Sequence, residues 1–538
     1  MENRRKNIEH IKNILIAVLF ISAVLLLSFF WKDISLNDLE NFAIGIQEND
    51  EYRPELSELT RPGQIEVSFG SGVYTVISAD WQLASHGIDV SKTDAGTSGD
   101  GGMQQGDAGA GAVSGTGMTD DGIYDYLRYL MSQYMDQPDI SQEKIERSQY
   151  DEVMSYPSVT AAFSFDIPFS DFLKNNGIEP PQGSSSVTNV TKISFSSASS
   201  ENIFIYDDSE KAYYRFVTAD DEFADMMSAE LSSLISGIEA TNITAYYTIE
   251  NLAGIKNDTL IPVYQKDTAK SLSCKSEFSI NDASEVRKYE QMFFPSGLDF
   301  VRKITENKGS LIYTYGYSQR MLVLDETGRI SYTEELDSTQ YADIGFYEGL
   351  EEAVEYVKTH GGWSPMISEK AVPYLSQVSR IVSDDGKYKG YRYEFSIKLK
   401  GVPVSFTSGA MLRIEVYGSQ ITSYQRDIVA LTQKENAETI EVINAIDVIT
   451  SEYEEFGDIL IKQAKENKDE EMLKRYSSGN QFENVTENIN IIRFCMMRDT
   501  SANPSYLMSA WYIKIDGVKF WCSPQDGHIL AWNAEEAG

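Results

Sequence analysis

One segment near the start of the chain constrains its fold more than any other. Residues 14–31, ILIAVLFISAVLLLSFFW, form an apolar run from Ile14 to Trp31 whose polar members are Ser22 and Ser28. As a helix the run spans about 27 Å at ~1.5 Å per residue, close to the ~30 Å of bilayer hydrocarbon. The basic residues ahead of it are Arg4, Arg5, Lys6 and Lys12. The positive-inside rule therefore predicts a single membrane helix, with the N-terminus in the cytoplasm and the body outside.

A cleaved signal peptide is the competing explanation for this segment. Such a peptide has an apolar stretch of about 7 to 15 residues and a small-x-small cleavage site. Here the run is longer and leaves through SFFWKDISL, which favours an uncleaved anchor. We expect the anchor at residues 13–31, surrounded by membrane lipid, after a cytoplasmic tail at residues 1–12. Ser22 and Ser28 either hydrogen-bond to their own helix or contact a second membrane helix.

The charge balance excludes one class of partner. Lys and Arg total 46 against 82 Asp and Glu, so the net charge is −36. A field of that sign repels phosphate backbones, and we expect no binding to nucleic acid. The aromatic share of 12% is too high for a disordered acidic protein and is typical of a chain with many half-buried strands.

Beyond the anchor, the sequence predicts an α+β protein built of tandem extracytoplasmic domains, in which antiparallel sheets pack against helices. Residues 32–62 are polar and predict a stalk. The expected domains are a first α+β domain at 63–245, a central domain at 246–362 and a C-terminal domain at 363–538. Within the first domain, residues 86–122 are rich in Gly, Ser, Ala and Asp, and we expect a disordered loop there because so little apolar surface can be buried.

Two helices follow from the apolar period. Residues 122–135 place one set of apolar side chains on a single helix face, namely Tyr126, Leu127, Leu130, Met131 and Tyr134. Residues 344–359 do the same with Leu350, Ala353, Val354 and Val357. Gly361 follows the second helix and is expected to act as its C-cap.

The stretch LVLDETGRISYTEE, residues 322–335, predicts two strands joined by a tight acidic turn. The turn could be a calcium loop, a catalytic corner or scaffold. Its glycine, Gly328, is followed by an Ile and an aromatic residue, and the same order recurs after Gly418 and Gly527. Glycine supplies a positive φ, and the residues after it anchor the returning strand, so we favour scaffold. Asp325 and its neighbours lack the alternating ligands of an EF-hand.

No residue pattern indicates catalysis, a metal or a cofactor. The histidines, His10, His86, His360 and His528, are too far apart for a local zinc motif and are expected at surfaces or helix caps. With 82 acidic residues, a pair of nearby carboxylates arises by chance and carries little weight. Of the three cysteines, Cys495 and Cys522 lie on neighbouring strand-like runs and either form a disulfide or stay separate buried thiols, whereas Cys274 has no evident mate.

Two segments resemble a known family. FFPSGLDFVRKITENKGSLIYTYGYSQRMLVLDETGRISY and the tail SAWYIKIDGVKFWCSPQDGHILAWN, together with the charged N-terminus and single span, are similar to the YycH proteins and the related YycI. The residues that match the family pattern are Phe294, Pro295, Ser296, Arg302, Ile312, Tyr313, Thr314 and Gly328 to Tyr332. The Gly-rich insertion departs from that pattern.

YycH and YycI are accessory regulators of the WalK/WalR two-component system of low-GC Gram-positive bacteria. The resemblance implies a single-pass membrane protein, not an enzyme, whose outer body and membrane helix contact the sensor histidine kinase and adjust signalling in cell-wall homeostasis. It also implies a YycI-like sister protein as a further partner. The alternative is an extracytoplasmic cell-wall hydrolase or substrate-binding protein, which a deep pocket ringed by titratable groups would favour.

Overall fold

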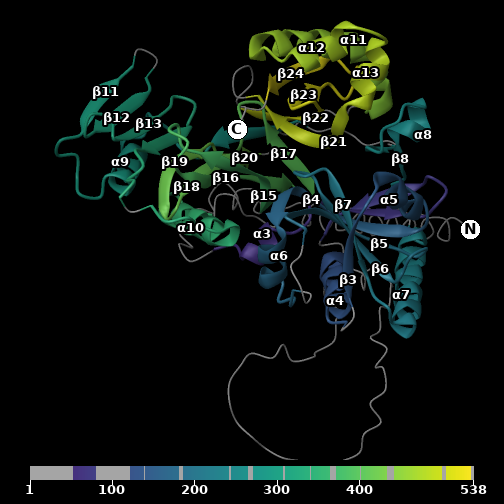
Figure 1. Ribbon diagram of the computed structural model, residues 1–538. Helices are drawn as coiled ribbons and strands as arrows, with labels where there is room; N and C mark the ends of the chain where they lie inside the picture. The colour runs from purple at the N-terminus through teal and green to yellow at the C-terminus, as the bar shows by residue number, and fades with distance from the viewer. Residues whose placement is uncertain are drawn as a thin grey trace, which may run out of the picture.

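The computed structural model describes residues 53–79, 122–137, 140–180, 186–241, 244–263, 271–306, 309–339, 341–363, 371–399, 401–432, 441–499 and 505–534. The predicted cytoplasmic tail, the predicted anchor, residues 32–52 of the predicted stalk and the Gly-rich loop up to residue 121 lie outside these residues. In the part of the chain that is described, no helix has the length and apolarity needed to cross a membrane. The described residues form an α+β fold of two sheets with packed helices (Figure 1).

The first sheet has the strand order β3-β7-β6-β5-β4-β1-β2-β8-β9. Its strands are β1 (Gln64–Ser68), β2 (Tyr74–Ile77), β3 (Ser141–Ile145), β4 (Ser158–Pro168), β5 (Asn189–Ser196), β6 (Asn202–Asp207), β7 (Ala212–Val217), β8 (Tyr246–Thr248) and β9 (Leu260–Pro262). The helices of this part are α3 (Leu56–Leu59), α4 (Ile123–Met135), α5 (Arg147–Met154), α6 (Phe169–Asn175), α7 (Asp221–Glu239) and α8 (Ile249–Ala253).

The first sheet has an apolar face and a polar face. Helices α4, α6 and α7 pack on the apolar face, where Phe163 of β4 meets Tyr124 of α4 and Phe172 of α6 edge to face. The five residues predicted on one face of the 122–135 helix are all buried in this layer, which confirms that prediction. The apolar period of α4 therefore positions the helix against the apolar face of the first sheet. The polar face of that sheet is turned toward the second sheet.

The second sheet has the order β11-β12-β13-β14-β19-β18-β16-β17-β21-β22-β10-β20, with β15, β23 and β24 paired beside this path. Its first strands are β10 (Leu272–Ser276), β11 (Arg302–Thr305), β12 (Leu311–Tyr315), β13 (Arg320–Leu324), β14 (Ile330–Glu334), β15 (Ala371–Val382), β16 (Lys389–Leu399) and β17 (Val402–Phe406). The later ones are β18 (Leu412–Tyr417), β19 (Gln420–Arg426), β20 (Val429–Thr432), β21 (Ile489–Arg498), β22 (Tyr506–Ile515), β23 (Val518–Cys522) and β24 (Ile529–Ala534). The associated helices are α9 (Ala283–Phe293), α10 (Phe346–Thr359), α11 (Ala445–Asn467), α12 (Glu470–Ser477) and α13 (Gln481–Glu487).

The two sheets do not follow the predicted domain boundaries. Strand β14 pairs with β19, and β10 pairs with β20 and β22, so the predicted boundary between residues 362 and 363 does not separate two sheets. The first sheet extends past residue 245 through β8 and β9. Residues 54–62, placed in the stalk by their polarity, include α3, whose Leu59 is buried in the core of the body.

The three hairpins with a recurring glycine form as predicted. Gly328, Gly418 and Gly527 join β13 to β14, β18 to β19 and β23 to β24, with φ values of +88°, +60° and +86°. Packing also requires a residue without a side chain at position 328, because an added Cβ would lie 2.5 Å from Ser276 Cβ and 2.6 Å from the Phe278 carbonyl oxygen. The 322–335 stretch is thus a scaffold hairpin docked on the segment that follows β10.

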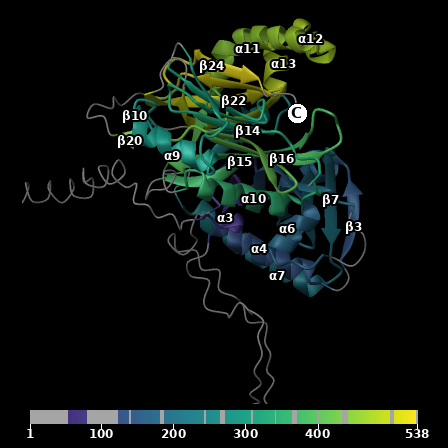
Figure 2. The ribbon, with the colours of Figure 1, turned by 90° about the vertical axis from the view of Figure 1, so that its left-hand side faces the viewer.

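Around β21–β24 the layers are stacked as helix, sheet, sheet, helix, whereas α10 packs on β16, β18 and β19 of the second sheet. Helices α11, α12 and α13 pack on one face of β21–β24, with Phe456 of α11 against Phe520 of β23. Figures 1 and 2 show these helices at one end of the molecule and α4, α6 and α7 at the other, with the sheets between them. The inner faces of the two sheets meet in the middle of this stack.

Candidate functional site

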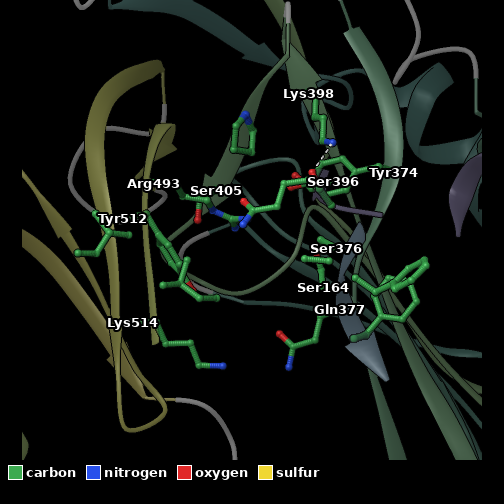
Figure 3. Close-up of a pocket in the computed structure, with 18 of the residues that line it drawn as sticks. Ser164, Tyr374, Ser376, Gln377, Ser396, Lys398, Ser405, Arg493, Tyr512 and Lys514 are labelled. Carbon is green, nitrogen blue, oxygen red and sulfur yellow. Dashed lines mark hydrogen bonds between the residues drawn. The ribbon is translucent and has the colours of Figure 1, made fainter. Parts of the chain in front are cut away.

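A cavity of about 720 Å³ lies where the inner faces of the two sheets meet (Figure 3). Strands β1, β4 and β5 line it from the first sheet, and β15–β17 with β21–β23 line it from the second. A volume of this size is typical of pockets for small organic ligands. The cavity is therefore the candidate functional site.

The first-sheet wall is polar because of strand alternation. Glu66 lies opposite Thr160, and Lys192 lies opposite Ala162, so these residues share the face turned away from the helices. Lys192 Nζ is 3.5 Å from Glu66 Oε2. The Glu66 carboxylate raises the pKa of Lys192 above its ordinary value, although burial opposes the shift. Glu66 and Lys192 thus compensate each other's charge on that wall.

The opposite wall is built by two rows of side chains on β21, β22 and β23. In one row Arg493 lies opposite Tyr512, which lies opposite Trp521; in the next row Lys514 lies opposite Lys519. All five line the cavity. The Arg493 guanidinium lies over the Tyr512 ring at 4.9 Å from its centroid. This wall therefore presents three cations, two of them directly across from one another.

Arg493 differs from the other described arginines near the cavity. Its Nε atom is buried and has no hydrogen-bond partner among the described residues, and it makes no ion pair with any of them. Unsatisfied buried donors are rare in proteins because each one costs about 1–3 kcal/mol. Figure 3 shows Arg493, Tyr512 and Lys514 on one side of the cavity and Tyr374, Ser376 and Gln377 on the other.

The carboxylates that line the cavity are already engaged. Glu394 Oε1 accepts from Arg413 Nε at 2.8 Å, and Asp258 pairs with Arg147 at 3.3 Å. Burial disfavours the ionised form of Asp208, but hydrogen bonds from Lys211 and Tyr206, and the charge of Lys514, lower its pKa overall. Burial raises the pKa of Asp166, which accepts from Thr191 Oγ1. The acids of the cavity thus interact with neighbouring donors and cations, among them Lys514 of β22.

The remaining second-sheet contacts close the cavity. Lys398 Nζ lies 5.0 Å from the Tyr374 ring centroid and donates to the Gly63 carbonyl at 3.4 Å, which ties β16 to the segment before β1. Trp521 Nε1 donates to Ser405 Oγ at 3.0 Å, and so fixes β23 against β17. The first contact thus connects the two sheets, and the second lies within the second sheet.

Of the residues predicted at functional positions, Ile14, Ser22, Ser28 and Trp31 lie outside the described residues. Cys495 and Cys522 are free thiols, so the disulfide considered from the sequence does not form in this structure. The reason is strand alternation: Cys495 lies opposite Ala510 and Cys522 opposite Trp511, and neighbouring residues of β22 face opposite sides of the sheet. Burial raises the pKa of the Cys495 thiol to about 12.

The described histidines occupy the kinds of position that were expected. His360 is the C-cap residue of α10, and His528 is exposed in the turn before β24, 2.6 Å from Asp526. His10 and His86 lie outside the described residues. Across the described ranges, no group of three or more His, Cys, Asp or Glu side chains is placed to hold a metal ion.

The cationic wall was not predicted from the sequence, although one local feature of it is visible there. Asp516 and Gly517 both have positive φ, as in a two-residue hairpin turn of type I′. In IKIDGVKF such a turn places Lys514 opposite Lys519. The sequence does not show that a second sheet covers this face, and so the lysines look like ordinary solvent-facing residues.

A second candidate surface lies on the part of the second sheet that carries the family resemblance. Phe294 and Tyr313, which match the family pattern, are buried, and Phe293 stacks on Tyr332 at 4.9 Å between ring centroids. The loops and strands around them carry a set of exposed apolar side chains, here called the 298–317 surface: Leu298, Phe300, Ile304, Tyr315 and Tyr317. In Figure 1 this part, with α9 and β11–β13, projects from the rest of the molecule.

Comparisons with known proteins give one structural likeness. No protein-family model matches the chain, and no curated protein matches it. A search of solved structures finds the crystal structure of YycH from Bacillus subtilis, with 15% sequence identity and a TM-score of 0.47, covering 87% of this chain and 97% of that chain. This solved structure bears the name of the family that residues 293–332 and the C-terminal tail of this chain resemble.

Proposed function

We propose that this protein is a membrane-anchored extracytoplasmic regulator that binds a sensor histidine kinase of the WalK type and adjusts its two-component signalling. It acts by contact with the kinase and not by transforming a substrate. Two sequence features support the proposal: the apolar run Ile14–Trp31, and the YycH-like residues in 293–332. The body would then stand outside the cytoplasmic membrane, next to the extracytoplasmic part of the kinase.

The observation that carries the proposal is the 298–317 surface. Among the described residues ten large apolar side chains are exposed, and five of them lie in this one segment. Phe300 is 92% exposed. Clusters of exposed apolar side chains on a projecting part of a protein typically mark a protein-binding surface. An extended segment of the kinase's extracytoplasmic domain is the occupant that we propose.

The position of strand β11 suits pairing with an extended segment of the kinase. It lies at the end of the second sheet and pairs, among the described strands, with β12 alone. All four of its residues are exposed. An edge strand presents free backbone donors and acceptors, to which a partner strand can add. Phe300 precedes β11 and Tyr317 follows β12, so both lie at the same end of this strand pair. Their φ values are +67° and +57°, a conformation that costs roughly 1–2 kcal/mol in a non-glycine residue and is common at functional sites.

The test uses the full-length chain and the kinase together in membranes. Replacing both Phe300→Ala and Tyr317→Ala removes the two most exposed aromatic side chains of the surface. Truncation of anchor residues at an interface costs about 2 kcal/mol or more, so we expect the Kd for the kinase to rise more than tenfold. Kinase autophosphorylation should also lose its response to this protein.

The matched control is the double variant Tyr156→Ala and Val382→Ala, which removes exposed apolar side chains elsewhere on the body. It should bind the kinase as the unmodified chain does. Equal binding by the Phe300/Tyr317 variant and the unmodified chain, with both folded, would contradict the proposal.

A second candidate function is supported by the cavity. A cavity of about 720 Å³ lined by titratable groups favours an extracytoplasmic binding protein over a protein with shallow surfaces only. The cavity and the 298–317 surface lie on different parts of the second sheet, so that ligand binding and kinase binding can be tested separately.

A further inference from the structure

We propose that the kinase segment joins the second sheet as a strand beside β11, with apolar side chains along one face of β11–β14 and a carboxylate against Arg302. This inference rests on the proposed regulatory function and deepens it, because it names the chemistry of the partner segment. The face concerned, here called the open face, consists of Arg302, Ile304, Ile312, Thr314, Met321, Val323, Ser331 and Thr333.

The first step of the argument is that β11–β14 have two unlike faces, because side chains alternate between the faces along each strand. One face carries Tyr332, on which Phe293 of α9 stacks. Lys303 belongs to the same face, and its Nζ lies 3.1 Å from Glu290 of α9. The open face is the opposite one. Its apolar side chains neither belong to a hydrophobic core of the described residues nor pack against one.

The second step is the composition of the open face. Two rows of directly opposed residues cross it from β11 to β14: Arg302, Thr314, Met321 and Thr333 in one, and Ile304, Ile312, Val323 and Ser331 in the next. Ile304 is 36% exposed, and Ile312, Met321 and Val323 are half-buried. Neither row holds a carboxylate, in a chain with 82 Asp and Glu. A sheet face open to water is usually polar, and a contiguous apolar patch marks an interaction site.

The third step is the charge at the edge of the open face. Both rows continue through β19 to β18 and β16, where Glu415 accepts from Arg392 and Glu394 accepts from Arg413, each at 2.8 Å. Those charges are compensated within the sheet. Arg302, at the other end of its row, makes no ion pair with any described residue. A carboxylate directly opposite it on an added strand would form a cross-strand ion pair.

The fourth step is the choice of occupant. Antiparallel pairing of β11 with β11 of a second copy would bring Arg302 and Lys303 of both chains onto adjoining strands, where like charges repel. A kinase segment with an Asp or Glu two residues from an apolar residue avoids that repulsion. Because alternate residues share a face, its carboxylate would meet Arg302 while its apolar side chain extends the row of Ile304.

The first experiment is photo-cross-linking of the full-length chain to the kinase in membranes. Met321→benzoylphenylalanine places a photoreactive side chain on the open face, and we expect it to cross-link to the extracytoplasmic part of the kinase. Mass spectrometry of the product should locate a segment with an Asp or Glu two residues from an apolar residue. The matched control, Tyr156→benzoylphenylalanine, places the same group at an exposed site outside the second sheet and should give no product with the kinase.

The second experiment reverses the charge of Arg302. Like charges across an interface oppose association, so we expect Arg302→Glu to raise the Kd for the kinase at least about tenfold, and Arg302→Gln to raise it by a smaller factor. The matched control, Arg287→Glu, makes the same change at an exposed residue of α9 and should bind as the unmodified chain does. All three variants should melt with the unmodified chain, because both arginines are exposed.

Three results would overturn the inference: equal binding by Arg302→Glu and the unmodified chain, no cross-link from Met321 to the kinase, or a cross-link from Met321 to a second copy of this chain instead. The proposed function would survive each of these results if the Phe300/Tyr317 variant still loses the kinase. Absence of kinase binding by the unmodified chain would overturn both proposals. The two failures are therefore distinguishable.

Discussion

At the scale of single residues, Arg426 links three separate segments of the body. Its side chain is fully buried, and Nε and Nη2 donate to Glu277 at 2.9 and 2.8 Å. Two further donors reach the carbonyls of Gly361 and Gly362, at 3.1 and 3.0 Å. One side chain thus connects β19, the end of α10 and the segment after β10. Gly361 is needed there because an added Cβ would lie 2.8 Å from the guanidinium carbon.

We expect Arg426→Met to lower the free energy of unfolding by about 3–5 kcal/mol, because Glu277 would keep a buried charge without its partner. Urea unfolding followed by tryptophan fluorescence measures the change. The double variant Arg426→Met with Glu277→Gln should recover part of the loss. A loss below about 1 kcal/mol in the single variant would show that the pair contributes no more than a surface ion pair.

His360 makes stability depend on pH. Burial lowers its pKa below the ordinary value, although the hydrogen bond to the Tyr356 carbonyl opposes the shift, and its ring stacks on Tyr356 at 3.8 Å. The unfolded chain, with a histidine pKa near ~6.5, therefore binds a proton more readily than the folded chain. The contribution of His360 is complete above about pH 6.5 and is lost as the pH falls through its lower folded pKa.

We therefore expect the free energy of unfolding to fall between pH 7 and pH 5, and to fall less in His360→Phe, which keeps a stacked ring without a titrating group. Urea unfolding at each pH is the measurement. Parallel pH profiles of the two proteins would show that His360 does not contribute to this dependence.

At the scale of elements, the hairpin glycines allow a direct test. Gly328→Ala combines a strained positive φ with the close approach of Ser276 and the Phe278 carbonyl, and we expect a loss of about 2–4 kcal/mol. Gly386→Ala, in the turn between β15 and β16, has φ +73° but no atom within 4 Å of the added Cβ. It should cost only about 1 kcal/mol. Thermal or urea unfolding compares the two, and equal losses would mean that the contact with the 276–278 segment does not matter.

Local patterns predicted the elements well because the forces that form them are local. Gly328, Gly418 and Gly527 mark turns by their own conformational freedom, and the apolar period of 122–135 and 344–359 locates the buried helix faces. The candidate site was harder to predict. Lys514 and Phe300 occupy strand and loop positions that look alike in sequence whether they face solvent, a cavity or a partner.

At the scale of the whole molecule, pairing between strands that are far apart in the sequence determines the domain organisation, which local sequence patterns do not indicate. Residues 272–276 pair with residues 429–432 and 506–507, and no local pattern indicates such partners. The predicted central and C-terminal domains therefore share a sheet. The cavity follows from the same long-range arrangement, since its walls come from strands separated by hundreds of residues.

The anchor is tested on the whole protein. We expect the full-length chain to stay with membranes after alkaline washing, with its N-terminus at Met1, because a span of about 27 Å is long enough to remain inserted. A variant without residues 1–31 and carrying a cleavable signal peptide should be recovered in the soluble extracytoplasmic fraction. Cell fractionation and mass spectrometry of the N-terminal peptide measure both outcomes. A soluble wild-type chain that begins beyond residue 31 would mean that the segment is a cleaved signal peptide.

The pairing of β10 with β20 and β22 sets an order of events during biogenesis. Leu272 lies opposite Leu507, so β10 waits for a strand that is synthesised much later. At ~5–20 residues per second, synthesis of the intervening segment takes on the order of ten seconds or more. During that interval the edge of β10 is open, as is that of β21 until β22 arrives. A ribosome that stops before residue 506 would release a chain with exposed, aggregation-prone strands, so quality control of this protein should act most on chains that end before β22.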